Sequence, residues 1–461
     1  MDASAPLAQN SGEWKGRPAG LPGGVPPPSV PLSFLGAASF GLIACGVALL
    51  MTRTLAILDP TNDRVVGAAH FAMLATLSMG VLGALHQFTP VIAKKPLRSV
   101  RLSRATFVCW LAGSWLLPLG FITQQERVVE VGGGFAGLAV VFFVVNISRP
   151  LSGRRMGTPV TGLRLATIGF VVTACYGVVY VIDRREHWFD LSGHVVLAHA
   201  SVGLLAWLGL AYFSVSEKLW PMFMLAHVPG RHHSTRVGIW ALFAGTTLLS
   251  CGLLFGVVWL GVGAGLIVAT GIGAHLFSLL THVRHRRRAS DLHLCFVIGS
   301  AIWLLVGTSL AVAGALATMG HHHVAVALVA ASISALAGWL LVALVGHSYK
   351  IVPFIVWSAL RGRGIERNTD GSPLMFGDLY NHSWSTFDFA TVNAGVAATC
   401  LGFATSTSSL IGVGGGFLVL TGLITLLNLS WRPARILSTK VATNPATGVP
   451  TPITSNAALR Q

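Results

Sequence analysis

The chain has 461 residues, of which 53% are hydrophobic and only 10% are charged, with a formal net charge of +16. Soluble domains carry roughly 25% charged residues, so a soluble protein of this length could not cover its surface with so few charges. The composition excludes that class and indicates a polytopic α-helical membrane protein. The positive charge does not indicate nucleic-acid binding, because the basic residues lie in short loops between apolar runs.

Apolar runs long enough to cross a bilayer, which takes about 20 residues each, follow one another along most of the chain. Residues 1–30, which include PAGLPGGVPPP, predict a disordered cytoplasmic N-terminal tail, and residues 431–461 predict a cytoplasmic C-terminal tail. Between them the pattern predicts an all-α transmembrane domain of about twelve helices over 31–430. The predicted spans are 31–52, 65–93, 104–123, 130–148, 161–182, 192–226, 237–258, 261–283, 292–316, 322–357, 385–405 and 408–430.

The loops between these runs alternate in charge. Stretches such as KKPLRSVRLSR, SRPLSGRR, VRHRRR and LRGRGIER carry most of the 31 Lys and Arg residues on one side of the predicted membrane. The loops on the other side are short and mixed in charge or uncharged. Because basic loops stay in the cytoplasm, we expect both termini there, in a multi-pass protein of the plasma or inner membrane.

The second, sixth and tenth runs are the longest, and each ends on a proline. Pro90, Pro221 and Pro353 are spaced by 131 and 132 residues. Prolines near span ends are common, but near-equal spacing on the three longest runs favours a real repeat over chance. We therefore predict four-helix repeats in a pseudo-threefold arrangement.

Histidines gather near the predicted outer ends of the same three runs. His70 lies in VGAAHFAML, His194 and His199 lie in SGHVVLAHA, and His321–His323 lie in MGHHHVAVA. Imidazoles inside a span usually face the bundle interior, because an unpaired polar group in lipid is costly. Several at one level suit axial ligation of haem iron or a copper site. The alternative is that each histidine bonds a backbone carbonyl or a water.

A second set of ionisable groups lies nearer the predicted cytoplasmic side. His86 is 16 residues beyond His70, which is about 24 Å deeper at 1.5 Å per residue, so it cannot share the outer site. These groups either line a path for protons or substrate or, for the lysines above all, snorkel to the interface. The candidates are Glu217, Lys218, His86, His347, Tyr349 and Lys350.

The pattern resembles the catalytic subunit of the haem-copper oxidase superfamily, including its nitric oxide reductase branch. That family has twelve spans, and its cofactor histidines lie near the outer ends of the second, sixth and tenth helices. The resemblance implies that His70 and His323 are the axial ligands of a low-spin b-type haem and that His321 is the proximal ligand of a second haem. His199, or His194, would stand where the family places its first ligand to the non-haem metal, copper or iron.

Two departures from the family pattern bear on activity. Family members with a full binuclear site carry a His-His pair toward the outer end of the seventh span, where this chain reads SCGLLFGVVWLG. Many oxidases also place a tyrosine four residues after the sixth-span histidine, where this chain has Gly203. We therefore expect electron transfer or handling of a small gas, O2 or NO, rather than full oxygen reduction.

The resemblance leaves the enzymatic status open and implies an oxidoreductase of the haem-copper oxidase or nitric oxide reductase type if the protein is an enzyme. Its implied partners are membrane lipid, a cytochrome c or quinol donor, and other respiratory subunits. Two other readings of the residues stay open. One is a cofactor-free transporter or a metal-ion or proton permease, and the other is an accessory subunit of a respiratory complex.

Overall fold

The computed structural model describes residues 26–153, 157–189, 193–228, 233–368 and 371–432. Within these ranges the regular elements are helices, and twelve of them are long and apolar enough to cross a membrane. The predicted fold class is therefore confirmed. The predicted tails 1–30 and 431–461 lie almost entirely outside the described residues.

The spans follow the predicted order and agree with the predicted boundaries to within a few residues. Two short helices, α2 (Leu55–Leu58) and η3 (Phe376–Leu379), lie between spans. The spans are α1 (Ser29–Thr52), α3–η1–α4 (Asp63–His70, Phe71–Ser78, Met79–Ala93), α5 (Val100–Thr123), α6 (Glu126–Ser148), α7 (Thr158–Glu186), α8–η2–α9 (Gly193–Ser201, Val202–Gly209, Leu210–Met224), α10 (His233–Leu254), α11 (Val258–Arg284), α12 (Leu292–Met319), α13 (Ala325–Arg361), α14 (His382–Ala404) and α15–η4 (Ser408–Thr425, Leu426–Trp431).

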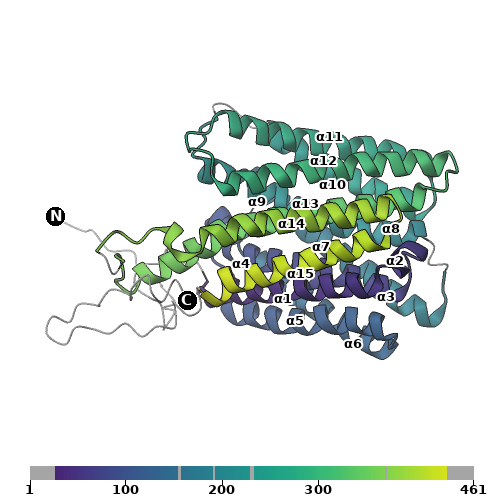
Figure 1. The fold of residues 1–461 in the computed structure, drawn as a ribbon, viewed down its shortest axis with the longest axis horizontal. Coiled ribbons are helices and arrows are strands. Elements are labelled where there is room, and N and C mark those ends of the chain that lie inside the picture. The colour runs from purple at the N-terminus through teal and green to yellow at the C-terminus, as the bar shows by residue number, and fades with distance from the viewer. Residues whose placement is uncertain (1–25, 154–156, 190–192, 229–232, 369–370, 433–461) are drawn as a thin grey trace, which may run out of the picture.

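The second, sixth and tenth spans form the inside of the bundle. In each of these three spans, 61% of the most apolar 18-residue window is buried inside the protein. The corresponding share in the other spans is 22% to 50%. In Figure 1, α11 and α12 lie on one flank of the molecule and α5 and α6 on the other. Because the inner spans recur every fourth helix, the burial agrees with four-helix repeats.

The second and sixth spans also match in local geometry. Each contains a π-helical segment, and these segments, η1 and η2, begin at Phe71 and Val202, which are 131 residues apart. Each span ends at a left-handed residue, Lys94 with φ 53° and Leu225 with φ 50°, again 131 residues apart. This spacing equals that of Pro90 and Pro221. The repeat predicted from the prolines therefore extends to backbone conformation in these two spans.

Small residues bring neighbouring helices into backbone contact at the π-helical segments. A Cβ atom added at Gly41 of α1 would clash with the carbonyl of Ala75, and one added at Gly169 of α7 would clash with the carbonyl of Ala206. Ala75 and Ala206 are themselves 131 residues apart. Close approach through small side chains is a common way for membrane helices to pack.

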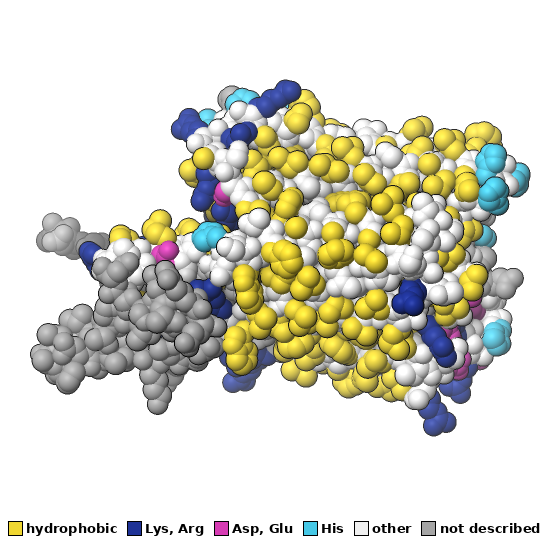
Figure 2. All heavy atoms as spheres, viewed as in Figure 1, with side chains coloured by type: hydrophobic (Ala, Val, Ile, Leu, Met, Phe, Trp, Pro, Cys, Tyr) yellow, Lys and Arg dark blue, Asp and Glu magenta, His cyan; other side chains and the backbone are white. Residues whose placement is uncertain are grey.

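The surface has the distribution expected of a membrane protein. Figure 2 shows hydrophobic side chains over the middle of the visible face, with Lys and Arg gathered toward the two ends. Large apolar side chains such as Trp259, Leu266 and Phe277 are exposed by 79%, 67% and 64%. Exposed apolar surface on this scale needs lipid to cover it. The chain is therefore a multi-pass membrane protein.

We call the end of the bundle at which α1 begins the basic end. The Lys350–Asp291 and Arg361–Glu366 ion pairs lie there, as do the exposed Arg286 and Arg287. The opposite end holds the junctions between α1 and α3, between α7 and α8, and between α12 and α13.

Candidate metal-binding site

His70 is the last residue of α3, directly before the π-helical segment η1. Its Nδ1 lies 2.8 Å from the Val66 carbonyl oxygen one turn earlier. Since a carbonyl can only accept, Nδ1 carries the proton and Nε2 keeps a free lone pair. The Phe121 ring of α5 stacks on the imidazole at 5.4 Å between centroids. The backbone thus holds His70 in the tautomer of a metal ligand.

His199 lies on α8, three residues before η2. Its ring lies beside that of His70, at the end of the bundle opposite the basic end. The centroids of the two rings are 6.4 Å apart and their planes differ by 23°. The Nδ1 atom of His199 is buried and has no hydrogen-bond partner among the described residues. The structure therefore brings together the predicted outer histidines of the second and sixth spans.

The separation of the two rings suits a shared metal ion. Metal–imidazole bonds are about 2.0–2.1 Å long, so an ion between two ring nitrogens places the ring centres about 6 Å apart. The orphaned Nδ1 of His199 gives one candidate ligand atom, and the free Nε2 of His70 gives the other. Imidazole nitrogen suits copper, iron, zinc and nickel.

Two tyrosines of α7 surround His199, and sequence reasoning missed both. The Tyr180 hydroxyl donates to the Val195 carbonyl at 2.7 Å, and the Tyr180 ring lies 5.8 Å from the His199 ring. The Tyr176 hydroxyl lies 2.9 Å from Ser250 Oγ of α10. The signal was the YGVVY spacing, because residues four apart share one face of a helix.

Beside His70 and His199, a bidentate ion pair connects the second span to the fifth. Arg184 of α7 donates to both carboxylate oxygens of Asp63, at 2.7 and 2.8 Å. The same guanidinium lies 5.4 Å from the centre of the Phe121 ring, which in turn stacks on His70. Two parallel hydrogen bonds fix direction as well as distance. The pair therefore helps to set the position of α3 relative to α7.

The histidines of the tenth span lie elsewhere. We predicted that His321–His323 open a span from 322, but α13 begins only at Ala325 and all three side chains are exposed. The residues form the turn that ends α12: His321 is left-handed with φ 54°, and the His322 amide donates to the Ala317 carbonyl at 2.8 Å. The span thus begins three residues after its predicted start, and no described contact brings His323 to His70.

His194 is also exposed, and its Nδ1 lies 2.9 Å from the Leu253 carbonyl at the end of α10. It makes no described contact with the ring of His199 or His70. Of the two sixth-span histidines considered for the non-haem metal, His199 is therefore the one that the structure places beside a second imidazole.

An aromatic cluster packs among the second, fourth, fifth and sixth spans. Trp207 of η2 stacks on Phe170 with centroids 4.1 Å apart, and Phe143 packs edge-on against both rings. The Trp207 indole donates to Ser78 Oγ at 3.1 Å, which fixes it between the second and sixth spans. No described ring contact joins this cluster to His70 or His199.

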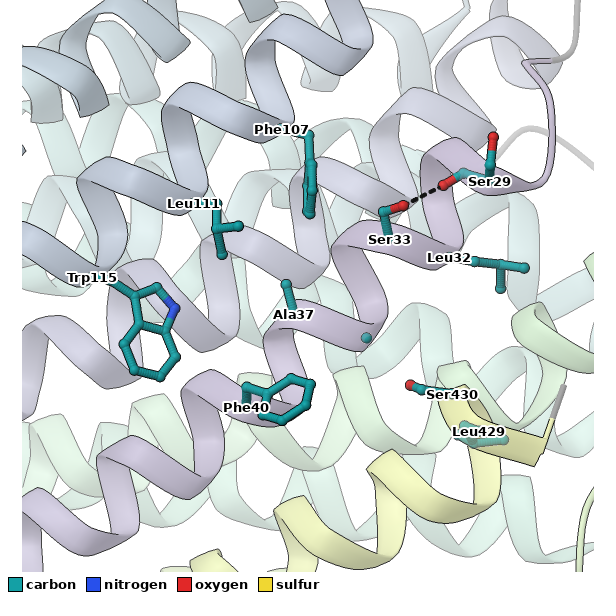
Figure 3. Close-up of a pocket in the computed structure, with 11 residues that line it drawn as sticks. Ser29, Leu32, Ser33, Ala37, Phe40, Phe107, Leu111, Trp115, Leu429 and Ser430 are labelled. Carbon is teal, nitrogen blue, oxygen red and sulfur yellow. Dashed lines mark hydrogen bonds between the residues drawn. The ribbon is translucent and has the colours of Figure 1, made fainter. Parts of the chain in front are cut away.

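Two cavities are described, and neither is lined by a histidine. One is a groove of about 600 Å³ between α1, α5 and η4. Its lining includes Phe40, Phe107, Trp115 and Ser430 (Figure 3). The other is a small hollow between α6 and α7 that includes Glu126 and Arg184. The groove opens beside the exposed Phe40, so it faces the membrane and not the histidine pair.

The candidates nearer the basic end do not form one network in the described contacts. Glu217 accepts a hydrogen bond of 2.6 Å from Thr235 of α10, while Lys218 beside it is exposed. His86 is fully buried between the rings of Phe34 and Phe143, with its Nδ1 2.7 Å from the Leu82 carbonyl. These groups therefore lie in separate surroundings.

The three candidates of the tenth span have three different partners. His347 packs edge-on against His293 at 5.0 Å. Tyr349 donates to Asp388 at 2.8 Å, and Lys350 pairs with Asp291 at 2.6 Å. Sequence reasoning missed both aspartates, although a lone acid inside an apolar run, as in FDFATVNAG, is a usable signal.

No family model and no curated protein matches this chain. Among solved structures, a haem-copper terminal oxidase dimer matches with a TM-score of 0.53. The match covers 90% of this chain and 85% of that chain, at 12% sequence identity. The chain has the fold of that oxidase. The predicted resemblance is confirmed at the level of the fold.

Proposed function

We propose that this protein is a redox protein on the oxidase fold, in which His70 and His199 hold one copper or non-haem iron ion. The ion serves electron transfer or the handling of a small gas such as O2 or NO. The observation that carries the proposal is the pair of facing imidazoles from two inner spans, with centroids 6.4 Å apart.

The ligand environment supports this role. Two protein ligands leave coordination positions open, which a metal that binds a small molecule requires. The Val66 carbonyl orients His70, as the outer partner of a metal ligand usually does, and the rings of the α7 tyrosines pack around His199. The seventh span supplies Ser250 near His199 where a full binuclear site would need histidines, so oxygen reduction to water is not part of the proposal.

The positive-inside rule, applied to the basic loops, supports a position of the pair on the outer side of a plasma or inner membrane, with both termini in the cytoplasm. A donor on that side would be a cytochrome c-like protein, and a donor within the bilayer would be a quinol. Membership of a larger respiratory complex is compatible with the broad apolar surface.

The haem form of the proposal has His70 and His323 as axial ligands and His321 on a second haem. It requires the exposed 321–323 turn to fold inward, whereas the rings of His70 and His199 already lie side by side. The tautomer of His70 suits either metal centre. We therefore place the single ion first.

The test is the metal content of detergent-purified protein, measured together with a reduced-minus-oxidised visible spectrum and a pyridine haemochrome assay. We expect about one copper or iron per chain and no haemochrome. His70→Ala and His199→Ala should each lose most of the metal. His194→Ala is the matched control, since this exposed histidine lies on the same helix, and it should keep the metal.

A sharp haem α-band that disappears in His70→Ala and His323→Ala would replace the single ion with haem. Folded protein without copper, iron or haem would overturn the redox proposal and leave the cofactor-free permease or the accessory subunit.

A further inference from the structure

Asp388 is a carboxylate without a counter-charge in the interior of the bundle. It lies on α14 and is 0% exposed. Its Oδ2 accepts hydrogen bonds from the Tyr349 hydroxyl at 2.8 Å and from Thr425 Oγ1 at 3.0 Å. Its Oδ1 is buried and has no hydrogen-bond partner among the described residues. No ion pair in the described part of the chain includes Asp388.

The free oxygen matters because a buried charge without a partner costs several kcal/mol. The nearest lysine in sequence to Tyr349 is Lys350, but its amine pairs with Asp291 at 2.6 Å. Either a proton on Oδ1 or a small cation beside it would balance this charge. The hydroxyl groups clustered around Asp388 favour the cation.

The groups around Asp388 are oxygen donors from three helices. Thr391 lies one turn further along α14, and its hydroxyl lies 3.0 Å from that of Thr421 on α15. Thr425 is one turn beyond Thr421 and bonds the carboxylate directly. Asn428 of η4 donates to the Tyr349 hydroxyl at 3.3 Å. Hard cations prefer oxygen ligands, and helix packing has already gathered them here.

The charge of the cluster selects the class of ion. One carboxylate with neutral hydroxyl and amide groups balances a single positive charge and leaves a divalent ion under-neutralised. The cluster contains no histidine or cysteine, so it does not suit copper or zinc. Asp388 lies six residues from the start of α14 at His382, about 9 Å along the axis, which places it near the basic end.

We propose that Asp388, with the hydroxyls of Thr391, Thr421 and Thr425, forms a binding site for a small monovalent cation, represented by Na⁺. The site is independent of the histidine pair, since it uses other spans and lies toward the other end of the bundle. It adds ion binding to the proposed redox role.

The experiment is thermal unfolding of the purified full-length protein in detergent while Na⁺ replaces choline at constant ionic strength. A ligand that binds only the folded state raises Tm with its concentration, so the wild-type Tm should rise with Na⁺ and level off. Asp388→Asn should show no Na⁺ dependence. Asp291→Asn removes a different acid near the same end and should keep the wild-type dependence.

Thr421→Val is a second variant with nearly the same shape as threonine, for use if Asp388→Asn does not fold. It should shift the Na⁺ midpoint to at least several-fold higher concentration. A wild-type Tm that does not depend on Na⁺ would overturn the proposal. So would a Na⁺ dependence that survives unchanged in Asp388→Asn or, where that variant does not fold, in Thr421→Val.

Discussion

At the scale of single residues, the candidate metal site depends on backbone carbonyls that fix side-chain direction. The Val66 carbonyl orients the His70 ring, and the Tyr180 hydroxyl binds the Val195 carbonyl one turn before His199. The first bond fixes the His70 ring directly, and the second fixes the backbone of α8 one turn before His199. Substitution of such outer partners commonly lowers metal affinity by about 10- to 100-fold.

Tyr180→Phe tests this support. Removing the hydroxyl deletes the 2.7 Å bond to Val195 and should lower the free energy of unfolding by about 0.5–1.5 kcal/mol. Because α8 then loses an anchor beside His199, metal affinity should fall by about tenfold. Thermal unfolding and metal titration of the purified variant measure the two effects.

Thr247→Val is the control for that substitution. The Thr247 hydroxyl is exposed and bonds only within its own helix, to the Phe243 carbonyl at 2.9 Å. The Thr247→Val substitution should leave metal affinity unchanged. Equal metal affinity in Tyr180→Phe and wild type would show that the Tyr180 hydroxyl does not support the site.

At the scale of helices, the π-helical segments η1 and η2 connect the repeat to the site. Each follows closely after one of the facing histidines, and π-helical turns occur frequently at functional sites. In each segment an alanine carbonyl, of Ala75 or Ala206, meets a glycine of the neighbouring helix. The two contacts position η1 against α1 and η2 against α7.

Gly169→Ala tests the helix contact at η2. The added methyl group clashes with the Ala206 backbone, so α7 and η2 must separate. Overpacking of this kind costs about 1–3 kcal/mol and should lower Tm accordingly. Gly134→Ala in α6 is the control, because a Cβ atom there meets nothing within 4 Å. If both variants unfold at the wild-type temperature, the close approach of α7 and η2 is not required for stability.

The positions of the helices could be predicted from the sequence, but their local details could not. Apolar length alone located the spans, because a bilayer demands about 20 apolar residues from each. The left-handed turn at His321, which leaves the three histidines outside α13, was not predicted, because apolar length does not reveal backbone conformation. The π-helical segments carry no compositional signal, and the resemblance gave no information on the tyrosines or on Asp388.

At the scale of the whole molecule, the two ends of the bundle differ in charge and in content. The basic end carries the Arg286 loop and the Asp388 cluster, whereas the opposite end carries the histidine pair and the 321–323 turn. From the positive-inside rule, we propose that the histidine pair lies at the outer face. The pattern of inner spans was predictable here because the three longest runs carry the prolines and most candidate histidines.

Cysteine labelling in intact cells tests this orientation. In a chain whose native cysteines are replaced, a new cysteine at His322 should react with an impermeant maleimide from outside. A new cysteine at Arg286 should react only after the membrane is permeabilised. Leu305→Cys, at an exposed position within α12, is the lipid-facing control and should stay unlabelled in both conditions. The reverse pattern would place the termini outside.

The central claim is that His70 and His199 bind the same metal ion. Pulsed electron paramagnetic resonance of the oxidised, paramagnetic protein counts the imidazole nitrogens coupled to the metal. We predict two imidazoles in the wild type and, in whatever metal the variants retain, one in His70→Ala and one in His199→Ala. A metal signal whose imidazole count is the same in both variants as in the wild type would contradict the account.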